Sequence, residues 1–204
     1  MKHCIIDFET MGTDVNQSVV IDMSAFVFDW DKFISDRPYD LSDISQIQKY
    51  KFDIKEQVAK YNFTIDKDTI AFWEQQSADV RKNIVPKKTD ISLEKFADQF
   101  INYLIPHGKI SYWWSRSNSF DPMILWRLFE AIGKTNMVQE YLPHWTLRDT
   151  RTWIDAKLDF PQKNGFCPIE DHKLWESTFK AHDSSWDILA DVLRLQAIER
   201  AEKL

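Results

Sequence analysis

Two stretches near the N-terminus constrain the fold most, because both have strand character and only a short polar segment separates them. Residues 4–8 and 19–28 are rich in β-branched, aliphatic and aromatic side chains. Residues 12–16 between them are mostly polar and begin with a glycine. This pattern predicts two strands joined by a turn.

The remaining chain alternates between strand-like and helix-like segments. Further strands are expected at residues 50–54, 109–114 and 145–147. Helices are expected at residues 66–84 with a break and an N-cap at Ser77, and at residues 92–105, 122–132, 151–156 and 183–203. Residues 158–180 carry proline, glycine and mixed charge, which favours a long loop or a small insertion. Two strands followed by strand–helix alternation predict an α/β fold, a mixed sheet with helices packed on it.

Residues 92–105 carry the clearest helical pattern of the chain. Apolar side chains recur there at the spacing of one helix face: Leu93, Phe96, Ala97, Phe100, Ile101 and Leu104. We therefore expect this helix to pack against the sheet.

Length, composition and charge exclude several classes of protein. The chain has 204 residues, 44% apolar and 14% aromatic, which suits one domain with a sizeable core (residues 1–204) and excludes a disordered protein. No apolar run has the length of a membrane span, the first residues do not resemble a secretory signal, and Cys4 and Cys167 lie far apart. These features predict a cytoplasmic protein with reduced cysteines and no membrane partner. A net charge of −6 excludes a general duplex binder but not a nucleic-acid enzyme, since bound cations invert the field of an acidic site.

The first strand ends in two acids, Asp7 and Glu9. Residues two apart on a strand project to the same face, so the two carboxylates stand side by side and repel each other unless a cation or proton lies between them. Such a pair is suited to Mg²⁺ or Mn²⁺, which prefer oxygen ligands. A solvated strand end with two surface acids remains the alternative.

Two further acidic positions open predicted helices. Asp121 follows the strand at 109–114, and His182 and Asp187 flank the start of the last helix. Asp121 could instead act as an N-cap, and His182 could be an ordinary surface residue. Taken together, four carboxylates around one site would require cations, and two divalent ions about 3.5 to 4 Å apart make such a site competent for phosphoryl transfer. A histidine at the rim would then take the proton of the attacking water.

These motifs resemble the DEDD superfamily of 3′–5′ exonucleases, in its histidine-containing DEDDh branch. Asp7, Glu9, Thr10 and Gly12 match the first motif, Phe120 and Asp121 the second, and His182 and Asp187 the third. The likeness is strongest to phage exonuclease A and related bacterial exoribonuclease-like domains. It extends over most of the chain, through residues 69–73, 81–84 and 148–152.

The resemblance implies a ribonuclease H-like fold with a mixed five-stranded sheet flanked by helices. It implies that Asp7, Glu9, Asp121 and Asp187 hold two Mg²⁺ or Mn²⁺ ions, with His182 as general base. The reaction would release nucleoside 5′-monophosphates from the free 3′ end of single-stranded DNA or RNA. Many members carry His-Asn where this chain has Arg116 and Ser117.

Several residues are candidates for binding the nucleic acid. The expected set is Thr10, Met11, Gly12, Trp73, Phe120, Arg116, Arg148 and Arg151. Trp73, with polar residues after it, is the favoured platform for base stacking, ahead of Phe8, Trp113 and Trp114. A basic cluster could follow the phosphate backbone: Arg81, Lys82, Lys87 and Lys88. Core packing of the tryptophans, a solvated helix end and an internal ion pair at residues 148–151 are the structural alternatives.

Two other functions fit parts of this pattern. A haloacid-dehalogenase-type phosphatase would use the aspartate ending the first strand, but it needs a second aspartate where Glu9 stands. A nucleic-acid-binding module of the same fold would have lost catalytic ligands, and here none is missing.

Overall fold

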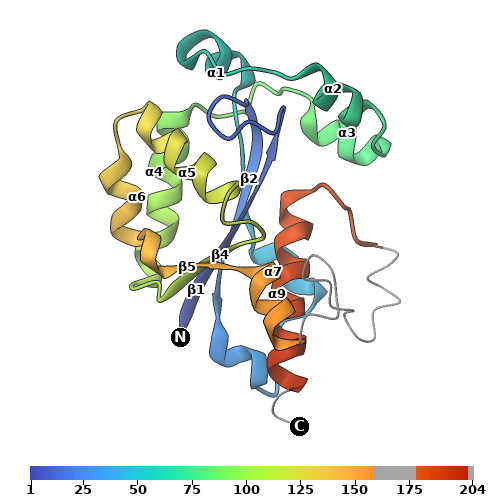
Figure 1. The fold of residues 1–204 in the computed structure, drawn as a ribbon, viewed down its shortest axis with the longest axis vertical. Coiled ribbons are helices and arrows are strands. Elements are labelled where there is room, and N and C mark those ends of the chain that lie inside the picture. The colour runs from blue at the N-terminus through green and yellow to red at the C-terminus, as the bar shows by residue number, and fades with distance from the viewer. Residues whose placement is uncertain (159–177, 202–204) are drawn as a thin grey trace.

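A five-stranded sheet forms the centre of the computed structural model, which describes residues 1–158 and 178–201 (Figure 1). Its strands are β1 (Lys2–Thr10), β2 (Val20–Asp29), β3 (Gln48–Lys51), β4 (Tyr112–Ser115) and β5 (Leu147–Asp149). Their order is β3-β2-β1-β4-β5, with β2 antiparallel to both neighbours and β1, β4 and β5 parallel. The expected mixed sheet is confirmed.

Helices cover both faces and one end of the sheet. They are α1 (Ile54–Tyr61), α2 (Lys67–Glu74), α3 (Ala78–Ile84), α4 (Leu93–Leu104), α5 (Asp121–Ala131), α6 (Thr135–Tyr141), α7 (Thr150–Lys157) and α9 (Ser184–Ala201). Short 3-10 turns are formed by Trp30–Ile34, Leu41–Gln46, Ile105–His107 and His144–Thr146. In Figure 1, α1, α2 and α3 lie beyond the end of β1 and the start of β2. Most of the loop expected at residues 158–180, with Cys167, lies outside the described residues.

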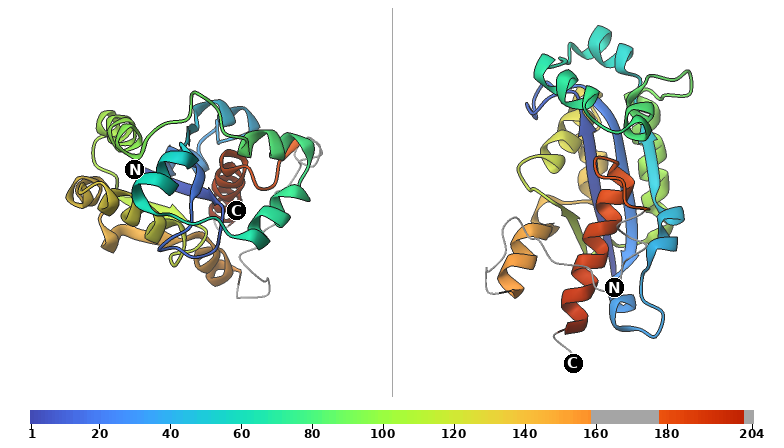
Figure 2. Two further views of the ribbon diagram at one scale, coloured as in Figure 1. Left: turned by 90° about the horizontal axis from the view of Figure 1, so that it is seen from above. Right: turned by 90° about the vertical axis from the view of Figure 1, so that its right-hand side faces the viewer.

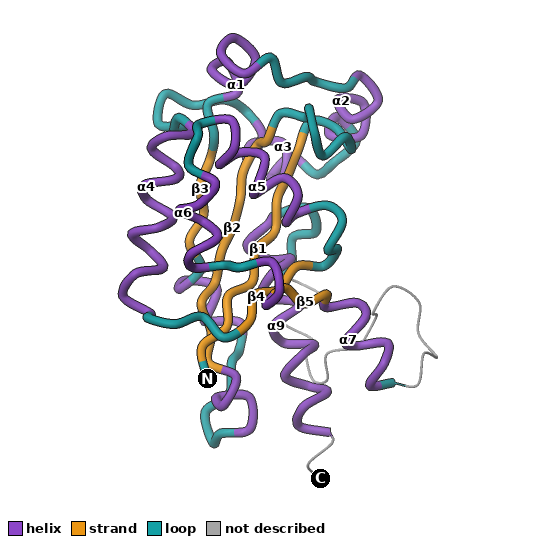
Figure 3. The backbone as a smooth tube through the Cα atoms, turned by 60° about the vertical axis from the view of Figure 1, so that its left-hand side comes forward, coloured by secondary structure: helices purple, strands orange, loops and turns teal. Residues whose placement is uncertain are grey.

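One face of the sheet, which we call the α4 face, packs against α4, α5 and α6 (Figure 3). On β1 it presents Cys4, Ile6 and Phe8, all less than 5% exposed. The apolar stripe predicted at residues 92–105 is buried against these strands, and Ser92 caps α4 by accepting the N–H of Lys95 at 3.1 Å. This face is the larger hydrophobic core, and burial raises the pKa of the Cys4 thiol.

The opposite face, the α9 face, is covered by α7 and α9, and α9 runs across β1 and β2 (Figure 2). Ile5, Phe26 and Phe28 pack there against apolar side chains of α9 such as Ile188 and Val192. The two cores therefore share the same strands, because alternate residues of a strand face opposite sides.

The structure differs from the expected elements in the middle of the chain. β3 ends at Lys51, because the side chain of Asp53 accepts the N–H of Glu56 and starts α1, which the sequence did not predict. α6 was not predicted either. The break at Ser77 is confirmed: its hydroxyl accepts the N–H of Val80 at 3.3 Å and separates α2 from α3.

The described helices were also compared with the length and hydropathy that a bilayer requires. Within residues 1–158 and 178–201, none combines enough length with enough apolar character to span a membrane.

Candidate active site

Asp7 and Glu9 point to the α9 face, at the end of β1 where its apolar residues stop. They lie opposite Ser24 and Asp22 of β2 respectively. A register shift follows directly after Glu9, so the regular pairing of β1 with β2 ends next to this acid. The alternation of β1 therefore places both carboxylates on one side, as predicted.

Asp187 reaches the same place from the first turn of α9. Asp7, Glu9 and Asp187 each offer a carboxylate oxygen, and these three atoms all lie within 4.8 Å of one another. Segments 178 residues apart in the chain thus converge on one acidic cluster (187 − 9 = 178).

Asp121 approaches from the other side of β1, at the first residue of α5. Its Oδ1 accepts the backbone N–H of Phe8 at 3.3 Å, and the residue is 4% exposed. Its charge acts on Asp7 more strongly than that of any other acid. The structure therefore brings all four predicted carboxylates together around the end of β1.

Burial raises the pKa values of all four acids, and the charges of nearby carboxylates add to the effect. For Asp7 burial comes first, followed by the charges of Asp121 and Glu9. For Glu9 burial is again the first cause, and the second is Asp22. Burial raises the pKa of Asp121 and of Asp187 to about 7. Four such groups are fully ionised only in the presence of compensating positive charge, and their oxygen donors suit hard divalent cations.

Asp187 is the middle one of three acids spaced four residues apart; Asp183 lies directly before α9, and Asp187 and Asp191 lie on it. Asp183, before it, is held by Lys49 Nζ at 3.0 Å and Asn83 Nδ2 at 2.9 Å. Asp191, after it, accepts from Arg116 at 2.5 Å, Arg194 at 2.8 Å and Thr150 at 2.7 Å.. Among the described residues, no basic side chain forms an ion pair with Asp187, which leaves its carboxylate available to a metal.

His182 is exposed and lies directly before Asp183, five residues before Asp187 in the chain. Its backbone is left-handed, with φ of 62°. Its ring meets Phe72 edge-to-face with centroids 5.0 Å apart, and Trp73 at 6.2 Å. The imidazole thus rests against α2 while the chain enters α9.

Thr10 and Gly12, which complete the first motif where β1 ends, have structural roles. Thr10 Oγ1 donates to the carbonyl of Gly12 at 2.6 Å. A Cβ on Gly12 would lie 2.4 Å from Ser18 Oγ, so a larger residue there would force the Ser18 side chain to move. Met11 and Phe120, also expected to bind substrate, are partly buried against the larger core.

The expected stacking platforms are buried, which corrects that part of the sequence analysis. Trp73 is 3% exposed, and its indole N–H donates to the carbonyl of Thr10 at 2.9 Å. Phe8, Trp113 and Trp114 are also buried. Phe72, the neighbour of Trp73 in the chain, is 40% exposed beside His182 and offers the open aromatic surface instead.

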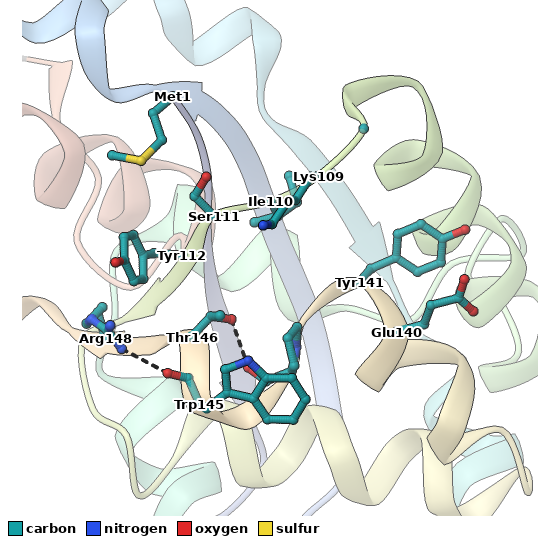
Figure 4. Close-up of a pocket in the computed structure, with 12 residues that line it drawn as sticks. Met1, Lys109, Ile110, Ser111, Tyr112, Glu140, Tyr141, Trp145, Thr146 and Arg148 are labelled. Carbon is teal, nitrogen blue, oxygen red and sulfur yellow. Dashed lines mark hydrogen bonds between the residues drawn. The ribbon is translucent and has the colours of Figure 1, made fainter.

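The three candidate arginines have separate environments. Arg116 is paired with Asp191. Arg148 points away from the acids: it donates to the carbonyl of Leu147 at 2.7 Å, and its guanidinium lies 4.3 Å from the centre of the Tyr112 ring. Figure 4 shows it in a cavity of about 860 Å³ at the opposite end of β4. Arg148 thus lies away from the acids, and its expected part in substrate binding stays a prediction, whereas Arg151 is exposed and close enough to lower the pKa of Asp121.

The basic cluster expected to follow the phosphate backbone lies on and after α3. Arg81 donates to the carbonyl of Glu74 at 3.2 Å, and Lys82 pairs with Asp79 at 3.3 Å. Lys87 and Lys88 are exposed. These contacts are those of a solvated surface, and they leave the role of the cluster as a prediction.

Sequence reasoning missed the buried polar residues behind the acids. Asp22 and Ser24 interrupt the apolar run of β2 two residues apart, which was a signal that they share a face. Lys49 gave no comparable signal, since its partners lie 27 and 134 residues away in the chain (49 − 22 and 183 − 49).

Comparisons with known proteins agree with this geometry. A family model described as the 3′–5′ exoribonuclease Rv2179c-like domain matches residues 2–182. An exodeoxyribonuclease of Enterobacteria phage T4 is 35% identical over 205 residues, covering 94% of this chain and 86% of that protein.

Solved structures of exonuclease I share the fold. A complex of the E. coli enzyme with a dT13 oligonucleotide matches with a TM-score of 0.58 and 14% identity, covering 99% of this chain and 41% of that one. The enzyme from Methylocaldum szegediense matches with a TM-score of 0.55 and 12% identity, covering 98% and 39%. This chain therefore spans about two fifths of those proteins. The ribonuclease H-like fold and the resemblance indicated by the motifs are confirmed, and the phosphatase alternative is not supported.

Proposed function

The chain belongs to the family of 3′–5′ exoribonuclease Rv2179c-like domains, and from this premise we propose that it is a metal-dependent exonuclease acting on single-stranded nucleic acid. It removes nucleoside 5′-monophosphates one at a time from a free 3′ end. One observation carries the proposal: the carboxylate oxygens of Asp7, Glu9 and Asp187 lie within 4.8 Å of one another. We also propose that residues 1–204 work as a single exonuclease domain in the cytoplasm.

The acidic cluster fits divalent cations by the chemistry of its donors. Asp7, Glu9, Asp121 and Asp187 supply only carboxylate oxygens, which Mg²⁺ and Mn²⁺ prefer. The four residues would hold two ions between β1, α5 and α9. Such a pair of ions, when bound, acidifies a water and stabilises the leaving oxygen of a phosphodiester.

His182 is the proposed general base. The residue is exposed just before α9, which carries Asp187, and Phe72 and Trp73 contact its ring edge-to-face. Its imidazole would accept the proton of the attacking water, a role that contributes about 10²- to 10⁴-fold in rate.

The role of His182 can be tested with a variant that keeps its backbone. Asparagine tolerates a left-handed conformation better than most residues, so His182→Asn removes the base without straining the turn. We expect kcat to fall by about 10²-fold or more while Mn²⁺ affinity, measured by calorimetry, stays the same. An equal loss of Mn²⁺ binding would instead indicate a structural role at the metal site.

Phe72 and Arg151 are the proposed substrate contacts nearest to the acids. Phe72 would stack on a base near the 3′ end, because it is exposed next to His182. Arg151 lies near Asp121 and could pair with a phosphate. The family description names RNA and the phage T4 relative is a DNA exonuclease, so both substrates must be compared.

The central experiment uses single strands of DNA and RNA labelled at either end. Wild type with Mn²⁺ should shorten a 5′-labelled strand stepwise and release the label of a 3′-labelled strand as the first product. EDTA or Asp7→Ala should abolish both. Binding without shortening would identify a nucleic-acid-binding module, and release of inorganic phosphate alone would identify a phosphatase.

A further inference from the structure

A group of polar side chains fastens the turn at His182 to the sheet; all are buried except Asn83, which is partly buried, and Lys49, whose side chain is 28% exposed. We call this group the anchor cluster; its members are Asp22, Ser24, Lys49, Asn83, Asp183 and Ser184. It joins β2, β3 and α3 to the start of α9. None of its members belongs to the four carboxylates proposed to hold metal.

Lys49 is the only cation of the anchor cluster, and it bridges two buried acids. Its Nζ lies 3.3 Å from Asp22 Oδ2 and 3.0 Å from Asp183 Oδ1. Asp22 is 2% exposed and Asp183 is 9% exposed. Two buried carboxylates this close to one ammonium depend on it for compensation, because an unpaired buried charge is costly.

Asp183 transmits this contact to the site. Its two side-chain oxygens are taken by Lys49 and Asn83, and its Oδ1 also accepts the N–H of Ser185 at 3.1 Å. Its backbone carbonyl accepts the N–H of Asp187 at 3.0 Å. His182 is the residue directly before Asp183, and its backbone is left-handed. Such a strained conformation is retained only when the surrounding structure fixes it.

Asp22 adds a second link, toward Glu9. The two residues are direct partners across β1 and β2, so their side chains share a face. Ser184 Oγ donates to Asp22 Oδ1 at 2.6 Å and lies 2.7 Å from Ser24 Oγ, which closes the connection between β2 and α9. Lys49 therefore balances the acid beside Glu9 while it holds the turn before Asp187.

We propose that Lys49 is a positioning residue for the exonuclease reaction: by bridging Asp22 and Asp183 it fixes His182 and Asp187 over Glu9 and Asp7. The inference rests on the proposed function, because His182 and Asp187 matter to the reaction only if the site is catalytic. Lys49 itself needs no contact with metal or substrate.

The test compares three variants in steady-state digestion of a 5′-labelled strand with Mn²⁺. Lys49→Met keeps the apolar stem and removes the charge, and Lys49→Arg keeps the charge. Lys32→Met is the matched control, since Lys32 pairs at 3.3 Å with the buried Asp43 at the far end of the same face. We expect Lys49→Met to lower kcat by about 10- to 100-fold with KM changed less than about threefold, and Lys49→Arg to recover most of the loss.

Amide hydrogen exchange supplies a reading that does not depend on activity. The amides of Ser185 and Asp187 should lose protection in Lys49→Met and keep it in Lys32→Met, because both bond to Asp183. If Lys49→Met does not fold, the double variant Asp22→Asn with Lys49→Met removes one acid with the ammonium and carries the same comparison.

Retention of kcat within twofold in Lys49→Met would overturn the proposal, as would an equal loss in Lys32→Met or unchanged protection of both amides. If wild type shortens no strand, the proposed function fails. The exchange result then still decides whether Lys49 anchors the turn.

Discussion

The two faces of the central sheet differ in how far their apolar character extends along the same strands. On the α4 face, Cys4, Ile6 and Phe8 are buried from the start of β1 to its end. On the α9 face, Ile5 is buried, but Asp7 and Glu9 follow it at the next two positions. One face of the sheet is thus apolar along the whole of β1, whereas the other is apolar at first and acidic at the end of β1.

The difference shows where this chain separates stability from chemistry. Hydrophobic burial on the α4 face stabilises the strands without an electrostatic penalty. The acids on the α9 face carry such a penalty, because they are buried close together and raise one another's pKa values. Residues of the α4 face should therefore govern unfolding, and those at the acidic end should govern turnover.

The acidic end of the α9 face should control activity. Asp187→Asn should lower kcat by about 10³-fold or more, since it removes a carboxylate that the metal site requires. Glu199→Gln provides the matched acid-to-amide change on the same helix, at a buried position of the apolar end. Stepwise digestion kinetics check both, and a comparable loss in Glu199→Gln would break the proposed division of the face.

The α4 face should control stability. Phe96→Ala removes a side chain that is 1% exposed and should lower the free energy of unfolding by about 3–5 kcal/mol. The kcat of the folded fraction should stay within about twofold of wild type. Gln99→Ala, on the exposed side of the same helix, should change stability by less than about 0.5 kcal/mol in denaturant titrations. A specific loss of kcat in Phe96→Ala would contradict the separation.

The metal-free protein should lose stability as pH rises. Burial raises the pKa of Asp187 in the fold from 3.8 to about 7. The stability that depends on a protonated Asp187 is therefore fully present below pH 4 and is lost as pH rises through 7. In EDTA, wild type should lose about 2 kcal/mol relative to Asp187→Asn between pH 4 and pH 8. Unfolding titrations of both proteins measure this; parallel pH curves would show that the carboxylate carries no such penalty. Mn²⁺ should stabilise wild type more at pH 7.5 than at pH 5.

The aromatic surface beside His182 should affect substrate binding. Phe72→Ala should raise KM by about tenfold with a smaller change in kcat, as expected for the loss of one stacked base. Trp145→Ala is the control, because Trp145 is 69% exposed in the cavity at the opposite end of the sheet. Equal KM values for Phe72→Ala and wild type would remove Phe72 from the substrate path.

Periodic features were predictable because they depend only on neighbouring residues. The stripe of α4 follows the helical period and is buried as predicted. Asp7 and Glu9 follow the strand period and share a face as predicted. The grouping of Asp121 and Asp187 with them could not come from periodicity. It came from the likeness of three short motifs to a known family.

The features that escaped prediction depend on distant partners or on which side of a short helix is covered. Phe72 and Trp73 are adjacent aromatic residues on α2, and the two-turn helix has no clear apolar stripe to show which one is buried. The pairing of Arg116 with Asp191 joins residues 75 positions apart. Arg148 lies on β5, next to β4 in the sheet, and its guanidinium packs over the ring of Tyr112. Only the folded structure reveals this contact.

The equal spacing of Asp183, Asp187 and Asp191 means that a slip of α9 by four residues, about 6 Å along its axis, would carry a neighbouring acid into the place of Asp187. Lys49 and Arg116, which lie outside α9, both keep an acidic partner only in the observed register, whereas Arg194 lies on α9 itself and moves with Asp191. Ion pairs with residues outside the helix thus fix the register of α9 against the sheet. In the metal site proposed above, the carboxylate offered to an ion would therefore be fixed by the fold.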